Sequence, residues 1–241
     1  MIEHNLKGVF DYIRFPVTTK FEFKNTSQKY RVFFKFFLIN LLIVVLISII
    51  TGFLRIRFNI NFKETNVQIP MIWVLNLTII PMTEEIAYRL PLNYKKGNLM
   101  LSFVAISYFI SSMFFSDGGA VDMLSNLYIR LSIMLFAGFF LYLLFQRKNF
   151  EHKISMFWSK HPKIIFYGYL ALFTLGHLDN YVLDLAVLIL FPILLLPQFI
   201  GGVFLSFIRS KFGFCYSVLF HVLVNVFAFV PQFVLYFQNH Q

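Results

Sequence analysis

The stretch that decides the fold is Ile69–Leu90, with the sequence IPMIWVLNLTIIPMTEEIAYRL. It is apolar over a length that can cross a membrane, yet near its end it carries two adjacent carboxylates, Glu84 and Glu85, followed by Arg89. A charged side chain in the middle of a bilayer costs about 3 kcal/mol even on lenient insertion scales, and such residues generally serve a function. The stretch therefore predicts a membrane helix that carries a reaction or transport site.

The whole chain has the composition of a membrane protein. Of its 241 residues, 59% are hydrophobic and only 13% are charged, whereas soluble domains carry about a quarter charged residues. The net charge of +10 would favour a nucleic-acid partner in a soluble chain. Here the lysines and arginines cluster between apolar runs, as membrane orientation requires. We therefore expect the lipid bilayer as partner and no nucleic acid.

The chain contains seven apolar stretches of about the 20 residues that a helix needs to cross a bilayer. They are Val32–Leu54, Ile69–Leu90, Leu99–Phe115, Met123–Gln146, Pro162–Leu178, Val182–Ile208 and Phe214–Phe237. The predicted fold is an all-α, polytopic membrane bundle of about seven transmembrane helices over residues 32–237. Residues 1–31 form a basic segment that we expect in the cytoplasm or at the membrane interface. The sixth stretch is long and holds Pro192 and Pro197, which predicts a kink there or a tilted helix.

The charges between these stretches predict the orientation. Lysine and arginine dominate the N-terminus and the loops after the second, fourth and sixth stretches, whereas the loops after the third and fifth carry aspartates only. The loop after the first stretch, which holds Arg55, Arg57 and Lys63, is the one exception. Because cytoplasmic loops are enriched in positive charge, we expect an integral, multi-pass protein of the cell (inner) membrane with its N-terminus in the cytoplasm.

Two further polar clusters lie in apolar runs, FTLGH at Phe173–His177 and HVLVN at His221–Asn225. Counted from the nearest flanking lysine at 1.5 Å per helical residue, Glu84, His221 and His177 lie roughly 16, 15 and 21 Å deep. In a core about 30 Å thick, all three fall near the middle. The matched depths predict that these side chains meet at one site.

Spacing within each cluster separates the roles of its members. Glu85 and Arg89 are four residues apart and can pair on one face of a helix. Glu84 then points elsewhere, which leaves its carboxylate free for chemistry. His221 and Asn225 are also four apart, so that a ring and an amide lie side by side.

In this order the clusters fit the motifs EExxxR, FxxxH and HxxxN, and over about residues 69–228 the chain resembles the CPBP family. This family contains the CAAX-protease and bacteriocin-processing intramembrane endopeptidases, including the Abi proteins. The resemblance implies cleavage of a peptide bond in a membrane-associated substrate, such as a prenylated or bacteriocin-like one. One departure is that 93 positions separate Glu84 from His177, so that two additional stretches lie between the first two motifs.

The resemblance also implies roles for the site residues. Glu84 would be the general base on a water molecule that His177 helps to hold, and His221 and Asn225 would donate hydrogen bonds to the oxyanion. Glu85 and Arg89 would organise the site. Members of the family are described both as metalloproteases and as metal-independent glutamate peptidases. Whether the reaction needs a cofactor therefore stays open. If zinc is used, its ligands would be Glu84, His177 and His221.

Two other functions remain compatible with these residues. A scaffold or bacteriocin-immunity protein of the Abi type would bind a partner in the membrane without cutting it. A transporter would use the glutamates and histidines as a proton relay, but the chain lacks the inverted repeats that favour this interpretation.

Overall fold

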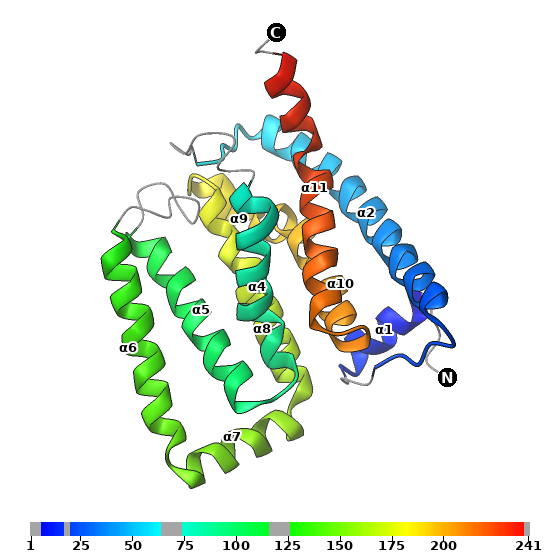
Figure 1. Cartoon of the computed structure of the whole chain (residues 1–241). Helices are drawn as coiled ribbons and strands as arrows, with labels where there is room; N and C mark the ends of the chain where they lie inside the picture. Colours follow the sequence, from blue (N-terminus) through cyan, green and yellow to red (C-terminus); the bar gives the residue numbers. More distant parts are fainter. Residues whose placement is uncertain (1–5, 17–19, 64–73, 116–125, 239–241) are drawn as a thin grey trace.

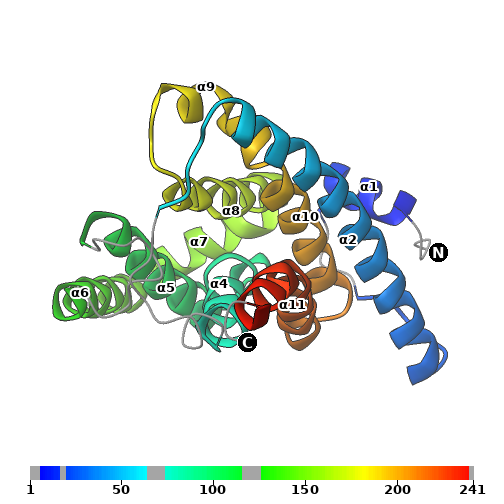
Figure 2. The ribbon, with the colours of Figure 1, turned by 90° about the horizontal axis from the view of Figure 1, so that it is seen from above.

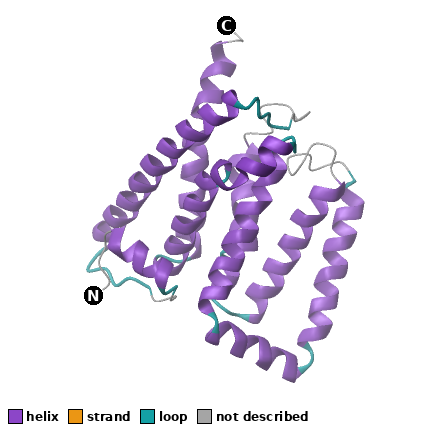
Figure 3. Ribbon diagram, turned by 180° about the vertical axis from the view of Figure 1, so that it is seen from behind, coloured by secondary structure: helices purple, strands orange, loops and turns teal. Residues whose placement is uncertain are grey.

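The computed structural model describes residues 6–16, 20–63, 74–115 and 126–238. Within these ranges the chain is helical, apart from turns and one isolated β-bridge between Phe62 and Tyr181. The α-helices are α1 (Leu6–Arg14), α2 (Thr26–Arg57), α4 (Ile80–Tyr88), α5 (Lys96–Phe115), α6 (Leu127–Phe145), α7 (Lys148–Lys160), α8 (Pro162–Gly176), α9 (Leu185–Leu194), α10 (Leu196–Lys211) and α11 (Phe214–Gln238). Short π- and 3₁₀-helical turns are η1 (Leu75–Ile79), η2 (Leu90–Leu92) and η4 (His177–Asn180). The expected all-α fold is thus confirmed (Figure 3).

Four helical segments of the described chain are long and apolar enough to cross a membrane. They are Thr26–Arg57, Lys96–Phe115, Leu127–Phe145 and Leu185–Lys211, and Phe214–Val230 is a shorter apolar helix. Their outward faces are hydrophobic: Leu42 and Phe53 on α2 and Phe136 on α6 are 63%, 71% and 72% exposed. Such large exposed apolar faces fit lipid rather than water. The protein is therefore a membrane protein.

The other expected stretches differ in length from the prediction. In the second, Ile69–Leu90, residues 69–73 lie outside the described chain, and helix continues through η1 and α4 to Tyr88. The fifth is helical for only 15 residues, Pro162–Gly176, before it tightens into η4. The sixth divides at Leu195 into α9 and α10, the kink that its prolines predict. Pro192 lies inside α9, and Pro197 stands in the first turn of α10, where its missing N–H has no bond to make.

The core of the bundle surrounds α10. This helix packs on α2, α8 and α11, while α4 packs on α5, α8 and α11. Phenylalanine rings fill the contacts: Phe207 of α10 meets Phe36 of α2 edge-on at 4.9 Å between ring centroids, and Phe33 meets Phe220 of α11 at 5.8 Å. Seen from above, α4 and α11 lie side by side within the bundle, and α5 and α6 extend to one side (Figure 2). Helix α6 packs on α5 and α7.

The basic N-terminal segment packs against the bundle. Helix α1 buries Val9 and Tyr12, whose hydroxyl is hydrogen-bonded to Ser210 of α10 at 2.9 Å. Phe21 is buried as well, and its N–H donates to the carbonyl of Lys211 at 3.0 Å. The segment is therefore continuous with the core, because its apolar side chains cover the end of α10.

Basic segments gather at the end of the bundle where α7 lies (Figure 1). Lys96, at the start of α5, forms an ion pair with Glu151 of α7 at 3.5 Å. Trp158 of α7 donates its indole N–H to the carbonyl of Pro91 at 2.8 Å, which ties α7 to the turn after α4. Helix α7 itself carries no buried residue. The loop predicted between the fourth and fifth stretches is thus an exposed helix that crosses this end.

The opposite end carries the junction between α2 and α9. Lys63 is paired with Asp179 of η4, and Asp184 caps α9 by accepting the N–H of Val187 at 2.7 Å. Asp117 and Asp122, which were expected on this side, lie outside the described residues. Arg55 and Arg57, in the last turn of α2, lie at this end as well, so the exception in the loop pattern is present in the structure.

Candidate functional site

The two adjacent glutamates of α4 face different surroundings. Glu85 is fully buried, whereas the side chain of Glu84 is 14% exposed and borders a cavity. The difference arises because consecutive residues of an α-helix point about 100° apart. Glu84 therefore faces open space, and Glu85 faces the interior of the bundle.

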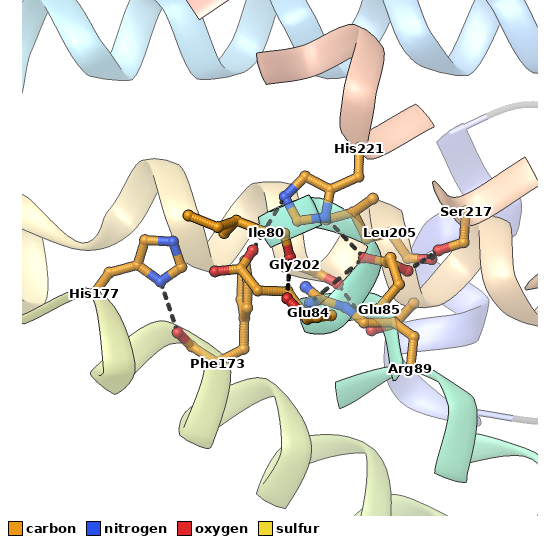
Figure 4. A network of polar contacts seen from close by, with 12 residues as sticks. Ile80, Glu84, Glu85, Arg89, Phe173, His177, Gly202, Leu205, Ser217 and His221 are labelled. Carbon is orange, nitrogen blue, oxygen red and sulfur yellow. Dashed lines mark hydrogen bonds and ion pairs between the residues drawn. The ribbon is translucent and has the colours of Figure 1, made fainter. Parts of the chain in front are cut away.

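Glu85 is held by three groups (Figure 4). The hydroxyl of Ser217 on α11 donates to its Oε2. The Nδ1 of His221, one turn further along α11, lies 3.0 Å from its Oε1. Arg89, one turn along α4, brings a guanidinium nitrogen within 3.6 Å of the same oxygen. The structure thus places Glu85 and Arg89 beside each other, as their spacing predicts, and adds two partners from another helix.

His221 lies between both glutamates. A carboxylate can only accept a hydrogen bond, so Nδ1–H of His221 is the donor to Glu85. The other ring nitrogen, Nε2, lies 3.3 Å from Oε2 of Glu84. His221 thus links the two glutamates at the edge of the cavity.

Phe173 connects the second motif to the first. Its ring packs under the Arg89 guanidinium, 3.7 Å from the guanidinium carbon to the ring centroid. The same ring meets His177 edge-on at 4.6 Å between centroids and His221 at 6.2 Å. A buried cation gains from such a ring face because few hydrogen-bond acceptors reach it. Phe173 thus positions Arg89 and both histidines.

His177 ends α8 and approaches the cavity from the side opposite α11. Its Nδ1–H donates to the carbonyl of Phe173 at 2.8 Å, which fixes the ring and leaves Nε2 as an acceptor. The ring lies on the Glu84 side of the cluster (Figure 4). It can therefore accept a hydrogen bond from a water molecule or from a ligand in the cavity.

One cavity of about 410 Å³ joins these groups. Glu84, His177, His221 and Asn225 all border it, so the structure brings together the four side chains for which the sequence predicts one site. Glu85 and Arg89 are not among its lining residues. The volume lies in the range of pockets that hold small ligands or short segments of larger ones. The arrangement places a carboxylate, two imidazole rings and an amide around one space.

The donor set does not fit a zinc ion. Among the described residues, no three His, Cys, Asp or Glu side chains stand close enough together to hold a metal. His221 directs both ring nitrogens at carboxylates, and Glu84 and His177 do not complete a ligand set with it. The zinc ligands Glu84, His177 and His221 that the resemblance implies are thus not assembled.

Sequence reasoning missed Ser217, and it named Phe173 in the FxxxH motif without giving it a role. Ser217 precedes His221 by four residues, as His221 precedes Asn225, so the three share one face of α11. That spacing is a signal that could have identified Ser217. The contact of Phe173 with Arg89 depends on how α8 crosses α4, and no local pattern encodes it.

No family model, curated protein or solved structure matches this chain.

Proposed function

We propose that the protein is an intramembrane endopeptidase that hydrolyses a peptide bond of a membrane-associated substrate. The observation that carries the proposal is that two adjacent glutamates have different surroundings. Glu85 is fixed by Ser217, His221 and Arg89, whereas Glu84 borders a cavity beside His221. Hydrolysis of an amide needs a base within reach of water and a proton for the leaving amine. The resemblance to CPBP endopeptidases supports the same reaction.

The proposed reaction begins with a water molecule between Glu84 and the ring acceptor of His177. Glu84 takes one proton from this water while its oxygen attacks the substrate carbonyl. The resulting oxyanion accepts hydrogen bonds from Asn225 and from the Nε2–H of His221. The carbon–nitrogen bond then breaks, and the proton held by Glu84 passes to the leaving amine. Preorganised donors of this kind contribute about 3–4 kcal/mol each to the stability of a transition state.

The membrane arrangement is part of this proposal. We infer that the protein crosses the cell membrane seven times and that its N-terminus lies in the cytoplasm. Short helices such as α8 complete their crossing with the residues that follow them. The gathering of basic segments at the α7 end supports this orientation. In reporter fusions, positions 148–160 should be cytoplasmic and positions 179–184 should not be; the reverse result would contradict the orientation.

Cleavage is tested with the purified protein in lipid nanodiscs. The probe is a library of random-sequence peptides, with and without a C-terminal prenyl group, and mass spectrometry reads the new termini. New termini with the wild type and none with Glu84→Gln would support the proposal. Unchanged cleavage after treatment with a metal chelator is expected, because the described residues assemble no metal site.

A scaffold of the Abi type is the alternative. It predicts that no library peptide is cut and that any cellular phenotype survives both Glu84→Gln and His177→Ala. That combination would overturn the peptidase proposal.

A further inference from the structure

Asn40 of α2 is a fully buried amide in the wall of the same cavity. Neither its Nδ2 nor its Oδ1 has a hydrogen-bond partner among the described residues. A buried polar group without a hydrogen-bond partner costs stability. Such a residue weakens the empty protein and is expected where it binds something.

The cavity face of α2 extends beyond this amide. Val44 and Ser48 follow Asn40 at intervals of four residues, so the three lie on one face, and all of them border the cavity. From Asn40 to Ser48 this face is about 12 Å long. That length matches three to four residues of an extended chain at about 3.3 Å each.

A second unsatisfied group lies on another wall. The Oε1 of Gln198, in the first turn of α10, is buried and has no partner among the described residues, and Gln198 also borders the cavity. Two amides from different helices, each with a buried unpartnered atom, thus border one space.

The chemistry of the lining restricts the ligand. A side-chain amide offers a donor and an acceptor side by side, which matches the N–H and C=O of a peptide backbone. The described lining holds the acidic residues Glu84 and Asp179 and no lysine or arginine, so it lacks the cations that a phosphate headgroup requires. A neutral backbone satisfies Asn40, and an anionic headgroup does not.

We propose that Asn40 is a substrate-binding residue that pairs with the backbone of an extended peptide lying along the Asn40–Ser48 face of α2. The peptide runs from Glu84 toward the end of the bundle that carries Asp179. The identity of the ligand rests on the proposed function. Binding through Asn40 is distinct from the cleavage step, and the two can fail separately.

The experiment measures binding without cleavage. Fluorescent random-sequence peptides are titrated into Glu84→Gln protein in nanodiscs, with and without Asn40→Leu. Loss of two neutral hydrogen bonds should raise Kd about tenfold. The melting temperature should stay constant or rise by about 3 °C, because leucine removes an unsatisfied buried amide. Asn98→Leu, an amide of α5 outside the cavity, is the matched control and should leave Kd unchanged.

The outcomes separate the two proposals. Equal Kd with and without the Asn40→Leu substitution, or a melting temperature that falls by several degrees, would overturn the role of Asn40 and make it a structural residue. Absence of any peptide binding by the Glu84→Gln protein would overturn it as well. If Asn40→Leu weakens binding while the wild type cuts no peptide, the binding role stands and the peptidase proposal fails.

Discussion

The two sides of helix α4 differ in their surroundings, one facing the packed interior and the other a cavity. On the buried side, Glu85 is surrounded by Arg89, Ser217 and His221, all from the packed interior. On the cavity side, Glu84 faces open space that Asn40 also borders with unsatisfied atoms. The contacts of Glu85 hold the geometry of the site, and the cavity wall is where a ligand can bind. Substitutions on the buried side should therefore affect stability first, and those on the cavity side should affect function first.

The largest effect on stability is expected from Glu85→Gln. The change leaves Arg89 buried without its counter-charge and replaces one of the two oxygens that accept from Ser217 and His221 by an amide donor. Breaking a buried pair from one side typically costs about 3–5 kcal/mol. Thermal unfolding in nanodiscs should show a large drop in melting temperature and in yield. A variant as stable as the wild type would show that the buried side is not the structural support of the site.

Asn225→Ala tests the cavity side. If the amide donates to the oxyanion, it acts mainly in the transition state, so kcat should fall about 100- to 1,000-fold with little change in KM. Steady-state kinetics with one cleaved library peptide would measure both constants, and a melting curve would show whether the fold persists. A rise in KM alone would assign Asn225 to substrate binding instead.

Two adjacent glycines of α10, Gly201 and Gly202, also differ in whether they face the cavity or the packed interior. A Cβ on Gly202 would lie 2.7 Å from Cδ1 of Leu170 and 3.0 Å from Cδ1 of Phe173, the ring under Arg89. Gly202→Ala should therefore cost about 1–3 kcal/mol of stability.

Gly201 borders the cavity, and a Cβ there would meet no atom within 4 Å. Gly201→Ala is the matched control, and it should be neutral or gain up to about 1 kcal/mol from helix propensity. Equal melting temperatures for the two variants would contradict the assignment of Gly202 to the buried side.

The sequence predicts those parts of the candidate site that depend on the geometry of a single helix. Helix periodicity places Arg89 beside Glu85, and a constant rise per residue brings Glu84, His177 and His221 to similar depth. The number of membrane crossings remains a prediction, since the described helices include four that are long enough.

The contacts between helices could not be predicted in the same way. The bond between His221 and Glu85 spans 136 positions, and it depends on how α11 rotates against α4. The sequence did not identify Asn40 as a cavity residue, because a single asparagine in an apolar run is compatible with many rotations of α2 about its own axis. Packing angles of this kind follow from side-chain fit across the whole core, which no short motif encodes.

Cleavage by Glu84→Gln protein tests the central claim most directly. Glutamine keeps the size of the side chain but cannot take a proton from water, so loss of the base should lower the rate about 100- to 10,000-fold. Mass spectrometry of peptides incubated with equal amounts of folded wild type and variant would measure it. We expect new termini with the wild type only, at matched melting temperatures. Equal cleavage by both proteins would contradict the account, because Glu84 would then not be the base.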